Sequence, residues 1–219
     1  MIKTENYNKE KLKFSFVTDM PVYLANAIRR SVLEIPVLAI DEVEIYKNDS
    51  ALYDEIIAHR IGLIPIKMDK ASKELKFKLK VKGPNTVYAT DMSPSIGTDL
   101  KLPIVILADG QEFEIVADAK LGKGIDHIKY SPGLVYYKHN LDEDVLNVVY
   151  VDAEGKVNYD DQDWKGISEE IVEKVKKAKG NDELIFEIES WGQLDSKDIF
   201  LKAIEALDGN LKELGKVVK

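Results

Sequence analysis

Three histidines are the side chains best suited to acid–base or metal chemistry, and none has a recognisable companion in the sequence. His59 and Arg60 share one side of an expected helix with apolar residues, so we expect both to face a packed surface and to have a structural or interface role rather than a catalytic one. His127 follows Gly122-Lys123-Gly124, which lacks the spacing and the Ser or Thr of a Walker A loop. A tight turn is therefore a better interpretation of these glycines than a nucleotide site, and His139 stands alone.

Pairs of acidic residues are the other candidates for metal binding or proton transfer. Asp54-Glu55 and Glu169-Glu170 fall in the first turns of expected helices, where carboxylates interact favourably with the helix dipole. Asp142-Glu143-Asp144 and Asp160-Asp161 lie in turn-like stretches without the spacing and glycine of a calcium loop. The chain contains no cysteine, so disulfides, thiolate metal sites and cysteine-ligated iron–sulfur clusters cannot form. We expect no catalytic residue, cofactor or metal.

The composition is that of a folded protein without a nucleic-acid-binding surface. Its 219 residues, 45% of them hydrophobic, suffice for one large domain or two small ones. The 31 basic and 39 acidic residues give a formal net charge of -8, which would repel a phosphate backbone. No apolar run approaches the ~20 residues of a membrane span, and the amino terminus lacks the apolar core of a signal peptide. We expect a cytoplasmic protein with no membrane contact and no direct nucleic-acid contact.

The elements that would position these residues begin with a strand at 12–16, where apolar and polar residues alternate. It runs into a helix that Thr18 or Asp19 can cap and that ends at Pro36. This helix is apolar on two sides, so we expect it to pack against two neighbouring surfaces. A sheet accounts for one of them. The other is either a neighbouring helix of this chain or a partner subunit. The main apolar stripe consists of Leu24, Ile28, Val32 and Ile35.

Residues 47–139 have the alternation and turns of a β-rich insertion. A strand at 37–46 precedes it, and Asn48-Asp49-Ser50 can cap a short helix that ends near Gly62. Residues 75–82 alternate apolar residues with lysine, which is more typical of an exposed or edge strand than of a phosphate-binding stripe. Asp109-Gly110 predicts a hairpin between strands at 103–108 and 112–119. A further strand is expected at 134–139.

The rest of the chain combines an acidic stretch with a long helix. We expect a strand at 145–151, a turn at Glu154-Gly155, a helix at 168–179 and a strand at 183–189. Asp195 or Ser196 then caps the final helix, whose apolar residues recur with the spacing of a seam that packs helix against helix. This seam consists of Phe200, Ile204, Leu207, Leu211, Leu214 and Val218.

Several motifs, taken in order, resemble the assembly subunit of cellular RNA polymerases. This family comprises the archaeal assembly subunit called D, the third-largest subunit in eukaryotes and, more distantly, the bacterial alpha amino-terminal domain. The core motifs are Ala25-Asn26-Ala27-Ile28-Arg29-Arg30, Pro36, Ala39-Ile40-Asp41, Asn48 with Ser50, Asp54-Glu55 and His59-Arg60-Ile61-Gly62-Leu63-Ile64-Pro65. Further matches are Pro103-Ile104-Val105, Gly110-Gln111, Gly122 with Gly124, residues 127–132, residues 186–190 and Gly192. Tyr130 stands where the family usually has Trp.

The resemblance implies an α+β fold in which a split dimerisation domain, residues 1–46 and 182–219, is interrupted by a β-rich insertion domain at 47–139. Many archaeal members carry a ferredoxin-like domain with cysteine-ligated clusters where this chain has the cysteine-free residues 140–181. The family's subunit is not catalytic by itself. It pairs with subunit L and forms a platform that recruits subunits N and P and then the second-largest catalytic subunit.

The resemblance and the helix geometry together predict two interfaces. Arg30 projects away from the main apolar stripe, and Arg60 can make paired hydrogen bonds to acceptors of a neighbouring subunit. The predicted heterodimer interface contains Phe200, Ile204, Leu207, Leu211, Leu214, Leu24 and Ile28. The predicted polymerase-assembly interface contains Asn26, Arg29, Arg30, Asp54, Glu55, His59 and Arg60.

Two other functions remain as alternatives. One is a small enzyme that uses Lys123, His127 and an acid from the Asp109 hairpin around a phosphorylated substrate. The other is a binding module that uses its acidic patches or the lysine row. The long seam favours an obligate subunit, because an enzyme domain gains nothing from an uncovered apolar face.

Overall fold

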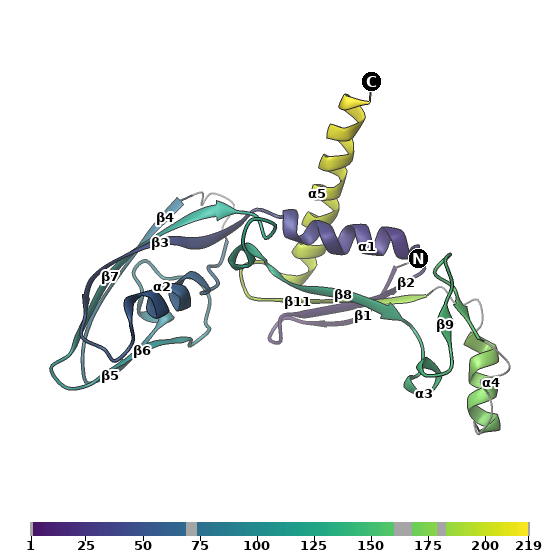
Figure 1. The fold of residues 1–219 in the computed structure, drawn as a ribbon, viewed down its shortest axis with the longest axis horizontal. Helices are drawn as coiled ribbons and strands as arrows, with labels where there is room; N and C mark the ends of the chain where they lie inside the picture. The colour runs from purple at the N-terminus through teal and green to yellow at the C-terminus, as the bar shows by residue number, and fades with distance from the viewer. Residues whose placement is uncertain (1, 69–73, 160–167, 179–182, 219) are drawn as a thin grey trace.

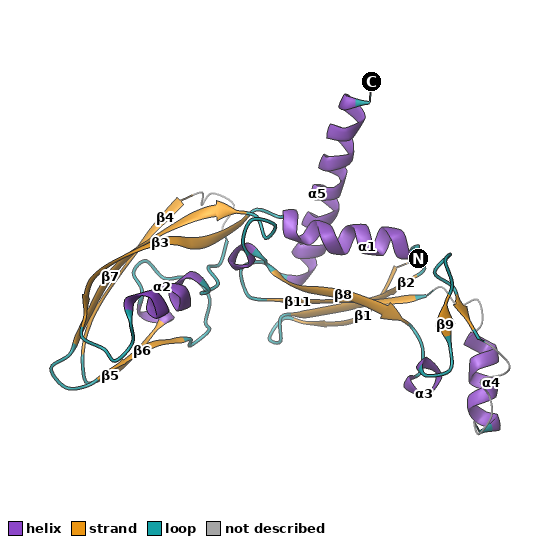
Figure 2. Ribbon diagram, in the orientation of Figure 1, coloured by secondary structure: helices purple, strands orange, loops and turns teal. Residues whose placement is uncertain are grey.

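The chain forms two lobes side by side and a smaller unit at one end, as Figures 1 and 2 show. A computed structural model describes residues 2–68, 74–159, 168–178 and 183–218. Helices and strands are mixed in both lobes, so the α+β prediction is confirmed. Among the helices described, none is long and apolar enough to cross a membrane.

The first lobe is a four-stranded antiparallel sheet with two helices on one face. It is built from both ends of the described chain together with one strand from its middle, residues 133–139. Phe16 is fully buried there: its ring stacks on Phe186 at 5.3 Å and meets Phe200 edge-on at 4.9 Å. Aromatic pairs at these separations stabilise a core beyond the area that they bury. The sheet has the order β1 (Ile2–Asn8), β2 (Lys13–Thr18), β11 (Leu184–Ser190) and β8 (Gly133–His139), and its helices are α1 (Val22–Ser31) and α5 (Ser196–Val217).

The second lobe is a three-stranded antiparallel sheet on which a helix and a two-stranded ribbon pack. Ile57 and Ile61 lie one helical turn apart, are fully buried and pack the helix against the sheet. The sheet has the order β3 (Val37–Asn48), β7 (Glu112–Gly122) and β4 (Glu74–Lys82); the ribbon is β5 (Asn85–Tyr88) with β6 (Pro103–Leu107), and the helix is α2 (Asp54–Gly62).

β3 joins the two lobes. Val37 and Ala39 are buried in the core of the first lobe, whereas Leu38 and Ile40 are buried in the core of the second. Successive side chains of a strand point to opposite faces, so one strand serves both cores. β3 also pairs with β7 along its length, and β8 pairs with β11 in the first sheet. Judged by which strands pair, the chain passes from the first lobe to the second near residue 37 and returns near residue 133. The predicted boundaries are 47 and 139.

The hairpin predicted from Asp109-Gly110 does not form. The chain does turn there, with Gly110 at φ +74° and the Gln111 backbone N–H donating to the Ala108 carbonyl at 3.2 Å. β6 nevertheless pairs with β5, while β7 lies between β3 and β4. A turn motif fixes a reversal of the chain, whereas burial decides which strands pair.

Two predicted helix caps are also wrong. α1 begins after Pro21 without a side-chain cap, and the Thr18 hydroxyl accepts the backbone N–H of Met20 at 3.2 Å before the helix starts. α2 begins at Asp54, and Asn48 instead closes the preceding loop by donating to the Leu52 carbonyl at 2.8 Å. Ser, Thr and Asn stabilise turns by the same local hydrogen bonds that cap helices.

Residues 141–159 and 168–178 make the third unit, which has a small apolar cluster of its own. The strand predicted at 145–151 is instead a short helix followed by two strand residues. Asp160-Asp161 and the expected end of the helix at residue 179 lie outside the described residues. The elements are α3 (Glu143–Leu146), β9 (Tyr150–Val151), β10 (Val157–Asn158) and α4 (Glu169–Ala178). The cluster consists of Val145, Val157, Val175 and Ala178.

Candidate protein-interaction surfaces

α5 extends well beyond the lobe that anchors it (Figure 1). Asp195 begins the helix as predicted, since its Oδ1 accepts the backbone N–H of Lys197 at 2.9 Å. The first turns bury Ile199, Phe200 and Ala203 in the first lobe. No residue from 208 to 218 is buried, so the last turns of α5 project away from the rest of the described chain.

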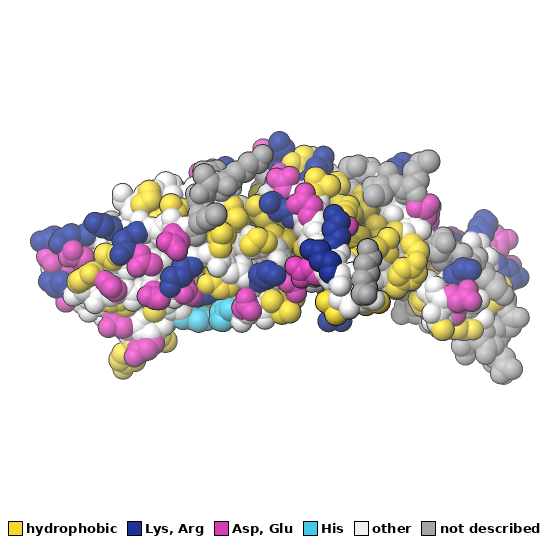
Figure 3. Space-filling model, turned by 90° about the horizontal axis from the view of Figure 1, so that it is seen from above, with side chains coloured by type: hydrophobic (Ala, Val, Ile, Leu, Met, Phe, Trp, Pro, Cys, Tyr) yellow, Lys and Arg dark blue, Asp and Glu magenta, His cyan; other side chains and the backbone are white. Residues whose placement is uncertain are grey.

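The projecting turns keep an apolar stripe uncovered. Leu211 and Leu214 are each 58% exposed, and Ile204 and Leu24 of α1 are exposed to a lesser degree. In the view along α5, hydrophobic side chains lie among charged ones near the helix and over the adjoining lobe (Figure 3). A stripe of this kind on an otherwise polar helix suits contact with another apolar helix.

The predicted seam is divided between this chain's own core and its surface. Phe200 is only 8% exposed and Ile28 is buried with it, so both can support a partner surface only from beneath. Leu207 lies between the two regions and packs partly on the same core. The residues do form one continuous stripe along α5, but the first part of this stripe is already buried in the core of the first lobe.

The carboxyl end of α1 presents two arginines. Arg29 donates from Nε and Nη2 to the Oδ1 of Asn26 at 3.2 and 2.9 Å, which holds it along the helix. Arg30 is exposed. Within the described residues neither arginine forms an ion pair, although the chain has 39 acidic residues.

The outer face of α2 combines apolar and basic side chains. Tyr53 is 78% exposed, and Ile56 and Leu63 are also exposed beside His59 and Arg60. His59 and Arg60 are exposed in this chain, because Ile57 and Ile61 occupy the buried side of α2. The packed surface predicted for them is therefore not the core of this lobe, and their interface role stays a prediction.

Polar contacts hold both ends of this α2 face. Arg60 donates from Nη2 to the Pro103 carbonyl at 2.6 Å, which ties the helix to β6. At the other end, Asp54 accepts the Asn48 side-chain amide at 2.7 Å. Asp54 and Glu55 both lie in the first turn, as predicted.

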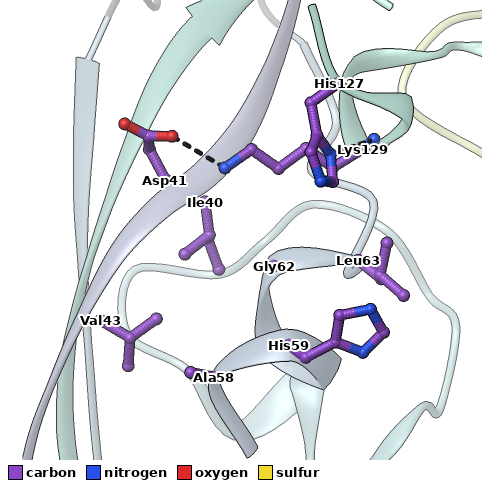
Figure 4. Close-up of a pocket in the computed structure, with 9 residues that line it drawn as sticks. All are labelled: Ile40, Asp41, Val43, Ala58, His59, Gly62, Leu63, His127 and Lys129. Carbon is purple, nitrogen blue, oxygen red and sulfur yellow. Dashed lines mark hydrogen bonds and ion pairs between the residues drawn. The ribbon is translucent and has the colours of Figure 1, made fainter. Parts of the chain in front are cut away.

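His59 and His127 meet across one small cavity of about 170 Å³, shown in Figure 4. Its other walls include Ile40, Val43 and Leu63. The Nδ1 of His127 accepts the backbone N–H of Lys129 at 3.1 Å, so the neutral ring carries its proton on Nε2. Over the described ranges, no group of three or more His, Cys, Asp or Glu could hold a metal ion.

Asp41 fastens β3 to the loop at residues 123–131. Its carboxylate accepts hydrogen bonds from Lys129 at 2.8 Å, Tyr130 at 3.1 Å and Lys120 at 3.4 Å. The Lys129 contact is the main reason that the pKa of Asp41 falls to about 2. Burial, helped by the bond to Asp41, raises the pKa of Tyr130 to about 12. Two motifs that are far apart in the sequence thus form one polar junction.

Tyr130 fits this junction because Gly122 leaves room for its ring. A Cβ added at Gly122 would stand 2.5 Å from the tyrosine ring. The Tyr130 hydroxyl donates to the Asp41 carboxylate, so Tyr130 contributes a hydrogen bond to this junction as well as packing. No local pattern in the sequence indicates this contact.

The residues of the small-enzyme alternative do not come together. Lys123 forms an ion pair with Glu34 at 3.0 Å, and Asp109 lies beyond the opposite end of the 11-residue strand β7. At ~3.3 Å per residue, the strand separates them by ~35 Å. The arrangement cannot act as one catalytic site.

The lysine row on β4 is largely neutralised. Lys76 pairs with Asp118 at 3.3 Å and Lys80 pairs with Glu114 at 2.6 Å, both across the sheet on β7. Lys82 pairs in the same way with Glu112. These pairs leave little free positive charge for a phosphate or an acidic patch, so the row is better understood as a solvated edge strand.

Comparison with known proteins gives a consistent result over most of the chain. The family described as the RNA polymerase Rpb3/Rpb11 dimerisation domain matches residues 13–211. DNA-directed RNA polymerase subunit Rpo3 of Pyrococcus horikoshii is 42% identical over 156 residues, which cover 64% of this chain and 60% of that protein.

Other relatives with the same name match over more of their length. The protein from Methanocaldococcus jannaschii is 35% identical over 188 residues, covering 83% of this chain and 93% of its own. That from Archaeoglobus fulgidus is 28% identical over 252 residues, covering 95% and 94%. The match therefore spans about 60% of the Pyrococcus relative but more than nine-tenths of these two.

Proposed function

The chain belongs to the family of the RNA polymerase Rpb3/Rpb11 dimerisation domain, and on this basis we propose that it is a non-catalytic assembly subunit of an archaeal DNA-dependent RNA polymerase. The similar proteins described above are named as subunits of DNA-directed RNA polymerase. The observation that carries the proposal is the projecting end of α5, whose Leu211 and Leu214 are left uncovered by the described part of this chain.

The free stripe of α5 is the surface proposed to pair with the small partner, subunit L. Ile204, Leu211 and Leu214 would supply its apolar contact, with Leu24 of α1 at the edge. Phe200 and Ile28 would hold the two helices in place from the core. Completing the burial of such side chains on an already formed helix is favourable because little ordering is needed.

The remaining surfaces are proposed to serve later assembly steps. Arg29 and Arg30, with Asn26 orienting Arg29, lie at the end of α1. His59 and Arg60 lie with exposed apolar residues on α2, whose first turn carries Asp54 and Glu55. We propose that these two surfaces contact subunits N and P and the second-largest subunit. The proposal includes a cytoplasmic location, no direct nucleic-acid contact and no iron–sulfur cluster.

Purification of the native protein tests this function. The chromosomal copy would carry an affinity tag, and co-purifying proteins would be identified by mass spectrometry and quantified against the tagged chain. We expect the polymerase subunits in near-equal amounts and transcription activity in the eluate. A homo-oligomer without polymerase subunits, or stoichiometric association with a metabolic enzyme, would refute the proposal.

A further inference from the structure

A groove of about 580 Å³ opens at the carboxyl end of α1, apart from the free stripe of α5. Its walls are the end of α1, the following turn Val32–Glu34, residues 125–128 and the beginning of β8. α5 contributes only Asn210, and none of its free apolar residues lies in the wall. The groove thus adjoins the proposed heterodimer surface without being part of it.

Four apolar side chains in the wall of the groove are exposed. Ile125 and Ile128 are each 65% exposed, and Leu33 and Leu134 are exposed beside them. Exposed apolar residues are unremarkable singly, but a contiguous set in a concave wall is typical of a binding surface.

The wall that carries these residues is held in shape by contacts of its own. The Ile125 backbone N–H donates to the Leu33 carbonyl at 3.1 Å. A Cβ at Gly124 would stand 2.9 Å from the Leu33 side chain, so the two segments are in close contact. Lys123 and Glu34 close the same junction with an ion pair at 3.0 Å. A groove formed before binding loses less entropy when a partner enters it.

The charge left at the groove is positive. Among the described residues that line the wall, Glu34 is the only acidic one, and Lys123 already neutralises it. Arg29 and Arg30 line the groove, and neither has a carboxylate partner in the described part of the chain. An unpaired guanidinium at the rim of an apolar surface is well suited to a carboxylate from another protein.

We propose that this groove receives an apolar segment bearing at least one carboxylate, supplied by the polymerase subunit that joins after the heterodimer has formed. Ile125 and Ile128 pack the apolar side chains of the segment, and Arg30 binds its carboxylate. The proposal rests on the assembly function proposed above. It adds a defined site, the 125–128 wall, and the chemistry of the segment that fills it.

Two variants test the two halves of this complementarity. Ile128→Asp places a charge on the apolar wall, and Arg30→Glu reverses the charge at the rim; both residues are exposed, so the fold should survive. Ile106→Asp and Lys101→Glu make the same changes at exposed positions in the second lobe. Each chain would be combined with its small partner and then with the other purified polymerase subunits, measuring heterodimer affinity and yield of complete enzyme.

We expect both groove variants to pair with the small partner as the wild type does, and to reduce the yield of complete polymerase at least tenfold, with both controls unaffected. Normal yield from either groove variant would overturn the proposal, and loss of heterodimer affinity would assign the groove to the first partner instead. Failure of the wild-type chain to assemble would refute the proposed function itself. Unfolding curves would show whether a variant misfolds. If Ile128→Asp does, Ile128→Ser takes its place.

Identification of the occupant provides an independent readout. A photoreactive amino acid at position 128 of the complete polymerase should cross-link to one segment, which mass spectrometry would locate. We expect this segment to contain apolar residues next to Asp or Glu. A basic or glycine-rich segment, or one from the small partner, would overturn the assignment.

Discussion

Replacing Leu211 by Asp should prevent tight heterodimer formation while leaving the chain folded. Leu211 is 58% exposed and lies two turns beyond Ala203, the last buried residue of α5. The substitution removes no contact within the core of this chain. In the unbound chain it should lower helix stability only through the lower helix propensity of Asp, by about 0.5 kcal/mol.

The expected loss of binding free energy has two parts. Full burial of a leucine contributes about 1.5–3 kcal/mol, so covering the exposed part of Leu211 should contribute about 1–2 kcal/mol. A carboxylate in the same place would lose its water without gaining a partner, which costs several kcal/mol more. A total of about 4 kcal/mol or more corresponds to binding weaker by a factor of roughly 1000, at ~1.4 kcal/mol per tenfold change.

Titration calorimetry of the purified chain with its small partner would measure this loss. Lys216→Asp is the matched control, because it places a carboxylate on the opposite side of the same exposed helix, where we expect wild-type affinity. If Leu211→Asp binds within tenfold of the wild type, the free stripe of α5 is not the heterodimer contact.

Other consequences of the structure can be measured separately. Arg60→Ala should keep the affinity for the small partner but lower the recovery of active polymerase in reconstitution, and normal recovery would place that contact elsewhere. Asp41→Asn should destabilise the chain by about 1 kcal/mol at pH 7, after allowance for solvent screening. Because the folded-state pKa of Asp41 is about 2, against an ordinary 3.8, this difference in unfolding free energy should be full above pH 4 and shrink as the pH falls toward 2. Gly122→Ala should destabilise the chain by ~1–3 kcal/mol through its contact with Tyr130, whereas Gly209→Ala, with open space around it, should be neutral or stabilising in denaturant unfolding. Elemental analysis and a visible spectrum of protein purified without oxygen should reveal no stoichiometric iron.

Local patterns in the sequence are sufficient to find most strands and helices. The alternation at residues 183–189 predicts β11, and Asp195 is correctly placed at the start of α5. The same patterns say that a residue is buried without saying what buries it. Phe200 and Leu211 belong to one seam, yet Phe200 meets Phe16 and Phe186 while Leu211 stays largely exposed on the described chain.

Contacts between distant segments are not accessible to that reasoning. Asp41 and Tyr130 are 89 residues apart, and their hydrogen bond depends on how β3 and the 123–131 loop come together. The groove wall arises in the same way from Leu33 and Ile125. The hairpin prediction at Asp109-Gly110 is wrong for a related reason, since a local turn cannot specify that β7 will pair with β3 and β4 instead of β6.

The double role of β3 gives a physical reason why separate surfaces of this chain can serve one assembly. Because Val37 and Leu38 are buried in different cores, a shift of β3 would disrupt the lobe that bears α5 and the lobe that bears α2 together. The Asp41 contacts with Lys129 and Tyr130 fix the same strand to the loop that also forms the groove wall. The α5 stripe, the groove and the α2 face are therefore held in a fixed arrangement before any partner arrives, and each new subunit meets a surface that needs little reordering.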